Sequence, residues 1–204
     1  IQRLAEILDW ANKRWPDSGL AGRNPARDKD SRMEKTRPSY SWLEVSHITT
    51  LLQAAQELEE GAKRRDYRNL GRPAVIASLV FAGPRNTELC QFTWAEIDFA
   101  RWLINIPDAK TEEGIREVNI VLGLMPYLNE WRERTAYSDS NAPVFPTATG
   151  EFRTKDSLLK RVVVPVVDRA REIIEERRRQ GGNDRPLPAI VTPQTFRRTF
   201  CALC

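Results

Sequence analysis

Two arginines in this chain stand in settings that suit the binding of a phosphate group. Arg85 follows a Gly-Pro turn between two apolar stretches, close to the start of an expected helix, where backbone N–H groups favour an anion. Arg197 lies in the last expected helix, in a second apolar setting. Guanidinium groups can donate bidentate hydrogen bonds to the oxygens of a phosphodiester as negative charge gathers on them. The pair therefore predicts a phosphate-binding site.

A lysine between the two arginines supplies a second component of phosphodiester chemistry. Lys110 stands in a polar loop, 108–114, between two short apolar segments that predict a β-hairpin. The departing 5′ oxygen of a cleaved DNA strand needs a proton, which a mobile lysine can deliver. A side-chain nucleophile would then hold the DNA end as a covalent ester. The sequence thus offers the phosphate clamp and the acid of a metal-independent transesterification.

The N-terminal elements that precede these residues are a helix, a linker and a second helix. Residues 1–15 have the apolar spacing of the end of a helix, and 16–38 are rich in charge and in helix breakers, which predicts an interdomain linker. Ser41 and Glu44 have the spacing of a capping box, in which the serine caps the helix that follows. That helix is amphipathic and carries the lone histidine, His47, which we interpret as a surface or boundary residue.

The elements that must position the two arginines are short. An apolar helix is expected to start at Pro73 and to end at Gly83, and Asn86 or Thr87 can cap the next helix. The remaining elements are short strands at 94–98, 102–106 and 117–121. Helices are then expected over 124–134, over 155–179 with an interruption or kink at Pro165, and around Arg197. The expected fold class is α+β, mostly helical, with a small antiparallel sheet.

Composition excludes several classes of protein. The chain has 204 residues, 41% of them apolar and 29% charged, as in ordinary soluble domains with a substantial core. It has no apolar run long enough to cross a bilayer and no signal-peptide pattern, and its three cysteines have no framework spacing, so a reduced cytoplasmic setting is expected. A lone CxxC (Cys201, Cys204) with one histidine is short of zinc ligands, so no metal or cofactor is expected. A net charge of +4 permits a polyanionic partner.

Several short motifs, taken in chain order, carry a family resemblance. The first is AGPRNTEL at 82–89, which is similar to a Gly-x-Arg-x-x-Glu-Leu box, and the second is WAEID at 94–98, which is similar to a Trp-x-Asp-Ile-Asp strand. Two short segments follow, KT at 110–111 and VFP at 144–146. The last is TPQTFRRTF at 192–200, which is similar to a Thr-x-His-x-x-Arg-x-Thr-Phe box. Together they resemble the catalytic domain of the tyrosine recombinases, or phage integrases, over residues 39–204.

The resemblance implies a fold and a reaction. The fold would be the DNA breaking-rejoining catalytic fold, with 1–15 as the end of an N-terminal core-binding domain and 16–38 as the interdomain linker. The reaction would be site-specific DNA recombination or integration by transesterification through a 3′-phosphotyrosyl intermediate. The partners would be double-stranded DNA and further copies of the protein, assembled on DNA as a synaptic tetramer.

The resemblance also assigns roles to individual residues. Arg85 and Arg197 would clamp the scissile phosphate, Lys110 would act as general acid, and Glu88 would support Arg85. Further DNA contacts are expected around the helix that follows Gly150 and beside the second arginine box, from Arg153, Lys155, Lys160, Arg161 and Arg198.

The chain departs from the family pattern in two places. Gln194 stands where the family usually has a catalytic histidine, and glutamine can hydrogen-bond the phosphate or the nucleophile but cannot exchange a proton near neutral pH. The family's tyrosine nucleophile lies downstream of the second box, whereas all four tyrosines of this chain precede that box. We therefore expect these 204 residues alone not to cleave DNA, and their full-length parent to do so.

Two other interpretations remain open at the level of sequence. The first is a degenerate integrase relative that holds DNA without cutting it, which Gln194 favours. The second is a helical interaction protein in which the two arginines are structural. That second interpretation requires Arg85 and Arg197 to lie far apart, whereas an enzyme needs both guanidinium groups at one shared pocket within reach of Lys110.

Overall fold

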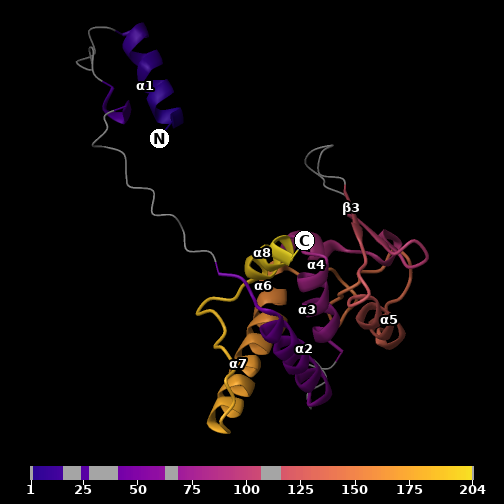
Figure 1. The fold of residues 1–204 in the computed structure, drawn as a ribbon. Helices are drawn as coiled ribbons and strands as arrows, with labels where there is room; N and C mark the ends of the chain where they lie inside the picture. The colour runs from indigo at the N-terminus through magenta and orange to yellow at the C-terminus, as the bar shows by residue number, and fades with distance from the viewer. Residues whose placement is uncertain (1, 16–23, 28–40, 63–68, 107–115, 204) are drawn as a thin grey trace. The chain divides into compact units, whose positions relative to one another are not determined.

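The computed structural model describes residues 2–15, 24–27, 41–62, 69–106 and 116–203, which form parts of two compact units, Ile1–Tyr40 and Ser41–Cys204 (Figure 1). The first unit contains helix α1 (Gln2–Arg14) and the 3-10 turn η1 (Pro25–Arg27). Hydrogen bonds from Asn24 to the carbonyl of Ala5 and from Arg27 to Asp9 join the turn to the helix. Within the described ranges, no helix is long and apolar enough to cross a membrane.

The second unit combines packed helices with a small sheet (Figure 1). Its three strands are antiparallel in the order β1-β2-β3, with Ile104 of β2 opposite Val118 of β3. The elements in chain order are α2 (Val45–Glu60), α3 (Arg72–Phe81), α4 (Asn86–Gln91), β1 (Ile97–Asp98), β2 (Leu103–Ile106), β3 (Arg116–Asn119), α5 (Met125–Arg134), α6 (Lys155–Leu158), α7 (Val164–Arg179) and α8 (Pro193–Leu203). The expected α+β, mostly helical fold class is confirmed.

Helix α3 lies at the centre of the core. Every residue from Arg72 to Val80 is buried, as its nearly continuous apolar sequence predicts. Helix α2 packs against both α3 and α7, while α8 packs against α3 through the fully buried Phe196. Pro73 occupies the first turn of α3 and Gly83 follows its last residues with a φ of 56°, so both predicted boundaries are confirmed.

A buried ion pair joins the end of α2 to the start of α3. Arg72 Nη1 lies 2.9 Å from Glu59 Oε2, and the two side chains are only 4% and 1% exposed. The backbone N–H of Gly71 donates to the other oxygen of the same carboxylate at 3.1 Å. Glu59 therefore pairs with a buried guanidinium and accepts a hydrogen bond from an N–H group at the start of α3.

The start of α2 differs from the sequence prediction. The helix begins at Val45 with Glu44 as its N-cap, and His47 supplies the second half of the capping box, so the predicted cap at Ser41 is wrong. The reason is tertiary: the backbone N–H of Leu43 donates to Thr199 Oγ1 of α8, which holds this stretch extended. His47 is buried, with Nε2 at 3.1 Å from the carbonyl oxygen of Arg185, so its interpretation as a surface or boundary residue was also wrong.

Two further elements are shorter or more irregular than predicted. The stretch 94–98 is mostly a 3-10 turn, η4 (Trp94–Glu96), and only its last two residues form β1. The interruption predicted at Pro165 is present: a π-helical turn, η6 (Leu159–Val163), separates α6 from α7 just before that proline. Proline has no N–H to donate to the preceding turn, which accounts for the irregular hydrogen bonding there.

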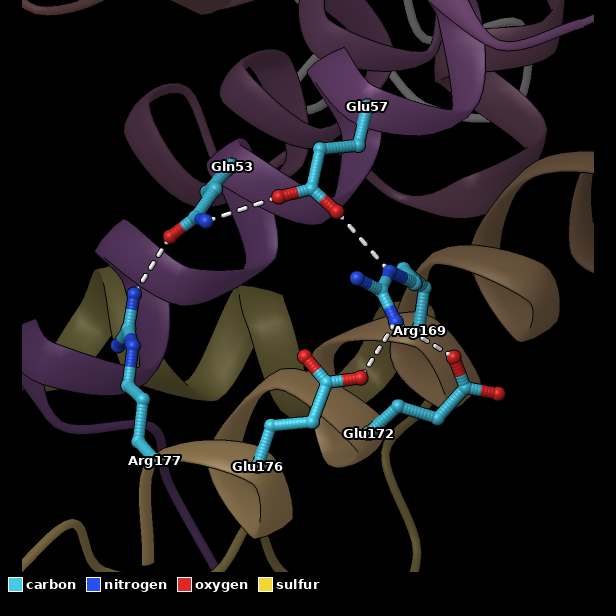
Figure 2. A network of polar contacts seen from close by, with 6 residues as sticks. All are labelled: Gln53, Glu57, Arg169, Glu172, Glu176 and Arg177. Atoms are coloured by element: carbon cyan, nitrogen blue, oxygen red, sulfur yellow. Dashed lines mark hydrogen bonds and ion pairs between the residues drawn. The ribbon is translucent and has the colours of Figure 1, made fainter. Parts of the chain in front are cut away.

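Figure 2 shows a polar network between α2 and α7. Arg169 of α7 donates from Nε to Glu57 of α2 at 2.9 Å and pairs with two further carboxylates of α7, Glu172 and Glu176. Arg177 donates to Gln53 of α2. Because these side chains are partly exposed, we assign the network to the alignment of two helices that the apolar core already holds together.

Candidate phosphate-binding site

The turn that carries Arg85 requires a glycine. Gly83 has a φ of 56°, in the left-handed region, and a Cβ atom at this position would lie 2.4 Å from Cδ1 of Phe200 in α8. Arg85 then adopts an extended conformation and is the N-cap of α4. The predicted caps Asn86 and Thr87 are therefore wrong, because the chain turns into the helix one residue earlier. The close approach of Phe200 shows that α8 packs directly on this turn.

Glu88 organises the start of α4. Its carboxylate accepts a hydrogen bond from the backbone N–H of Arg85 at 2.7 Å and one from Arg85 Nη1 at 2.6 Å. It also accepts two bonds from Arg116 at the start of β3, from Nη2 at 2.7 Å and from Nη1 at 3.3 Å. These four bonds use the whole accepting capacity of a carboxylate. Glu88 thereby joins the guanidinium groups of Arg85 and Arg116.

The environment keeps Glu88 ionised. Burial alone would raise the pKa of its carboxyl group, since the side chain is only 11% exposed. The hydrogen bonds from the Arg85 backbone, from Arg116 and from the Arg85 side chain outweigh that effect and lower the pKa below its ordinary value. The carboxylate is therefore a permanent negative charge between two arginines at neutral pH.

Arg197 reaches the same turn from the other end of the sequence. Its Nη1 donates to the carbonyl oxygen of Gly83 at 2.6 Å, two residues before Arg85 in the chain. Helix α8 is held in this position by Phe196 in the core and by the bond from Leu43 to Thr199. The two arginine motifs thus meet at one turn, which is the opposite of what a protein with two unrelated structural arginines would require.

A groove of about 400 Å³ opens beside this turn. Gly83, Arg116, Glu117, Arg197 and Phe200 are among its lining residues. Two arginines against one glutamate give this lining an excess of positive charge, and the aromatic ring supplies an apolar wall. A groove of this kind suits a phosphodiester, which presents anionic oxygens and an apolar sugar edge.

Lys110 and Gln194 are the other two residues predicted for catalysis. Lys110 lies outside the described residues, but the described strands on either side of it end at the pair formed by Ile106 and Arg116. The described part of the hairpin therefore ends at the arginine that contacts Glu88. Gln194 is exposed in the first turn of α8. Among the residues that the structure describes, no group of His, Cys, Asp and Glu could hold a metal ion.

The residues predicted to contact DNA elsewhere divide into two groups. Lys155, Lys160 and Arg161 are exposed on α6 and η6, and Arg198 is partly buried in α8. Arg153 is only 5% exposed, and its Nε donates to the carbonyl oxygen of Pro146 at 2.8 Å. Burial lowers the pKa of its guanidinium to about 10.

The burial of Arg153 follows from local geometry. Its neighbour Phe152 bridges to Pro146 in an extended, antiparallel pairing and is exposed. Successive side chains of an extended segment point to opposite sides, so an exposed Phe152 directs Arg153 inward. Because Arg153 is almost fully buried and its Nε is bound to a backbone carbonyl, we do not carry it into the proposed interface.

Sequence reasoning missed Arg116. The second hairpin strand was expected to begin at Glu117, one residue too late, which left Arg116 between the expected loop, 108–114, and the strand. The strand alternates half-buried and exposed positions, with Arg116 and Val118 half-buried. An arginine at a half-buried strand position is a signal for a carboxylate partner, but the identity of that partner, Glu88, depends on how the sheet packs against α4.

Comparison with solved structures identifies the fold. The chain is similar to the Tn1549 transposon integrase in complex with a circular intermediate DNA (TM-score 0.63, 16% identity, 99% of this chain and 65% of that chain). It is also similar to a lambda integrase dimer bound to a COC′ core site (TM-score 0.60, 14% identity, 98% and 50%). A third similar structure is the XerA recombinase (TM-score 0.51, 17% identity, 79% and 49%). The chain thus spans about half to two thirds of the length of these proteins.

The second unit therefore has the fold of the catalytic domain of tyrosine recombinases, as the sequence motifs predicted. No protein-family model matches this sequence. No curated protein is similar to it in sequence. At identities below 20% the likeness establishes the fold and leaves the function to be argued from the site.

Proposed function

We propose that this domain binds double-stranded DNA and belongs to an enzyme of site-specific recombination or integration. The observation that carries the proposal is the meeting of Arg197 with the turn that holds Arg85, next to a positively lined groove. In this proposal the enzyme breaks and rejoins DNA by metal-independent transesterification through a 3′-phosphotyrosyl intermediate. It acts in the cytoplasm, as a synaptic tetramer on DNA.

The chemical roles follow from the charges. Arg85 and Arg197 bind the non-bridging oxygens of the scissile phosphate and stabilise the charge that gathers there in the transition state. Lys110 protonates the departing 5′ oxygen as general acid. Gln194, three residues before Arg197 on α8, donates a neutral hydrogen bond to the same phosphate.

The comparisons support DNA as the partner. The Tn1549 integrase and the lambda integrase dimer were both solved bound to DNA, and this chain aligns over nearly its whole length with each of them. In the proposed complex, Lys155, Lys160, Arg161 and Arg198 contact backbone phosphates around the groove. Such contacts position the protein on DNA without reading its sequence.

A covalent-adduct assay tests the enzyme. The protein encoded by the whole open reading frame that contains residues 1–204 is incubated with duplexes carrying a nick, which trap a phosphotyrosyl adduct. We expect an adduct in the presence of EDTA, and its loss in the variants Arg85→Ala and Arg197→Ala. An adduct that forms only with a divalent metal would overturn the mechanism.

A second function, DNA binding without cleavage, is favoured by one observation. Gln194 occupies the place of the proton-exchanging histidine and is exposed in the first turn of α8. If this second function is correct, the same protein binds duplex DNA with a strong salt dependence but forms no adduct, and Gln194→His raises adduct formation. An adduct from the unchanged protein decides against it.

A further inference from the structure

We propose that Arg116 is a positioning residue of the phosphate-binding site: by a bidentate pair with Glu88 it holds the carboxylate that orients Arg85. The proposal rests on the proposed function and extends it to a residue that none of the sequence motifs contains. Its observational basis is the set of four hydrogen bonds on Glu88, two from Arg85 and two from Arg116.

The geometry gives Arg116 control over Glu88. Without Arg116, the Glu88 carboxylate would keep only the two hydrogen bonds from Arg85. It could then rotate about the terminal torsions of its side chain, because both bonds come from one short turn. Arg116 approaches from β3, a different element, and its two parallel N–H groups fix the plane of the carboxylate. The Arg116 side chain is 29% exposed, so the pair is partly shielded from water and stronger than a surface ion pair.

The charge balance supports the same role. Arg85 and Glu88 taken together carry no net charge, and a neutral pair is a poor partner for a phosphate. Arg116 restores a positive charge, and with Arg197 the cluster of three guanidinium groups and one carboxylate carries +2. Arg116 also lines the groove beside Arg197, so this charge faces the space that a phosphate would occupy.

The position of Arg116 links the clamp to the hairpin. Arg116 is paired with Ile106 at the point where the described strands end, and Lys110 lies between them in the sequence. The bond from Arg116 to Glu88 therefore fastens the base of that hairpin to the start of α4. Arg116 thereby fixes both the orientation of Arg85 and the base of the hairpin that carries Lys110, the expected general acid.

The test is a double-mutant cycle on the 204-residue protein, with a mixed-sequence duplex as probe. Affinity is measured by fluorescence anisotropy between about 50 and 200 mM salt, a range over which roughly one unit of slope reports one phosphate contact. We expect Arg116→Met to weaken binding about tenfold and to lower the salt slope by about one. Arg116→Lys keeps the charge but cannot make the two parallel bonds, so it restores binding only in part.

The cycle separates positioning from a general loss of charge or fold. In the Arg85→Ala background, Arg116→Met is expected to have a much smaller effect, because the part of its role that acts through Glu88 on Arg85 is already lost and only its own charge at the groove remains to be removed. Arg178→Met, in the last turn of α7, removes the same charge as a control. Thermal unfolding confirms that each variant is folded. If Arg116→Met does not fold, the comparison is made with Arg116→Lys instead.

Three results would count against a positioning role for Arg116. The proposal is overturned if Arg116→Met binds like Arg178→Met, if its effect persists undiminished without Arg85, or if Arg116→Lys restores binding completely. If Arg85→Ala and Arg197→Ala themselves leave the salt slope unchanged, the phosphate site is refuted, and the role of Arg116 falls with it. In the first three results, by contrast, Arg85→Ala and Arg197→Ala still lower the salt slope, so only the role of Arg116 is refuted.

Discussion

Arg197 Nη1 donates a hydrogen bond of 2.6 Å to the carbonyl oxygen of Gly83, across 114 positions of sequence. The same turn is covered by Phe200, one helical turn further along α8. Helix α8 therefore binds the backbone of the turn with one side chain and packs on it with another. The turn that leads into Arg85 is thus contacted by α8 at two side chains, Arg197 and Phe200.

The first prediction concerns Gly83→Ala. A Cβ at this position would lie 2.4 Å from the Phe200 ring, and its φ of 56° is unfavourable for alanine. We expect a loss of about 2–4 kcal/mol in the free energy of unfolding, measured by denaturant titration. Gly181→Ala is the matched control, because Gly181 also has a positive φ, of 91°, but a Cβ added there would meet no atom within 4 Å. Equal losses in the two variants would show that α8 does not press on the turn.

The second prediction concerns the pH dependence of Glu88. Because its pKa is lowered in the folded protein, its contribution to stability is complete above the ordinary value of 4.5 and declines as the pH falls through the lowered value. We expect the wild-type protein to be about 1–3 kcal/mol more stable than Glu88→Gln at pH 7. The difference should shrink below pH 4.5 in urea titrations. A difference that grows on acidification would contradict the assignment.

The third prediction concerns the buried pair of Glu59 and Arg72. Removing either charge leaves the other buried with reduced compensation, so Glu59→Gln and Arg72→Met should each cost about 3–5 kcal/mol of stability. In the double variant neither member of the pair is left buried without the other, while the glutamine oxygen can still accept from the N–H of Gly71. We expect it to lose much less than the sum of the two single losses. Strict additivity in chemical denaturation would rule out a coupled pair.

A fourth prediction separates buried from exposed cations near α6. Arg153→Met removes a guanidinium that lies inside the protein, so it should leave the affinity for duplex DNA and its salt slope unchanged. Lys155→Met removes an exposed charge and should lower the slope by about one. Anisotropy titrations of both variants check this. A reduced slope for Arg153→Met would mean that Arg153 reaches DNA after all.

The fifth prediction concerns the network between α2 and α7 (Figure 2). Arg169→Met loses ion pairs to Glu57, Glu172 and Glu176, yet we expect a cost of only about 1 kcal/mol, because water screens partly exposed pairs. The cost should fall further in about 1 M salt, where the Debye length is about 3 Å. Arg178→Met, whose pair with Glu175 is long and exposed, is the control with no measurable effect. A cost independent of salt would indicate lost packing.

Local sequence determined the parts of the site that depend on a few neighbouring residues. The end of α3 at Gly83, the proline in its first turn and the placement of Glu88 in the first turn of α4 were predicted correctly. These features follow from the permissive φ of glycine, the fixed φ of proline and the spacing of one helical turn. The recombinase-type fold was also predictable, because its motifs keep their order along the chain.

Tertiary structure alone decided which residues meet. Arg116 contacts Glu88 across 28 positions, and the pairing depends on how β3 lies against α4. Thr199 accepts a hydrogen bond from the backbone N–H of Leu43, which moves the start of α2 from the predicted cap at Ser41 to Glu44. The extended stretch at Phe152 turns Arg153 inward. Propensity and periodicity act over a few residues, whereas these contacts are set by the packing of distant elements around one core, which no local pattern encodes.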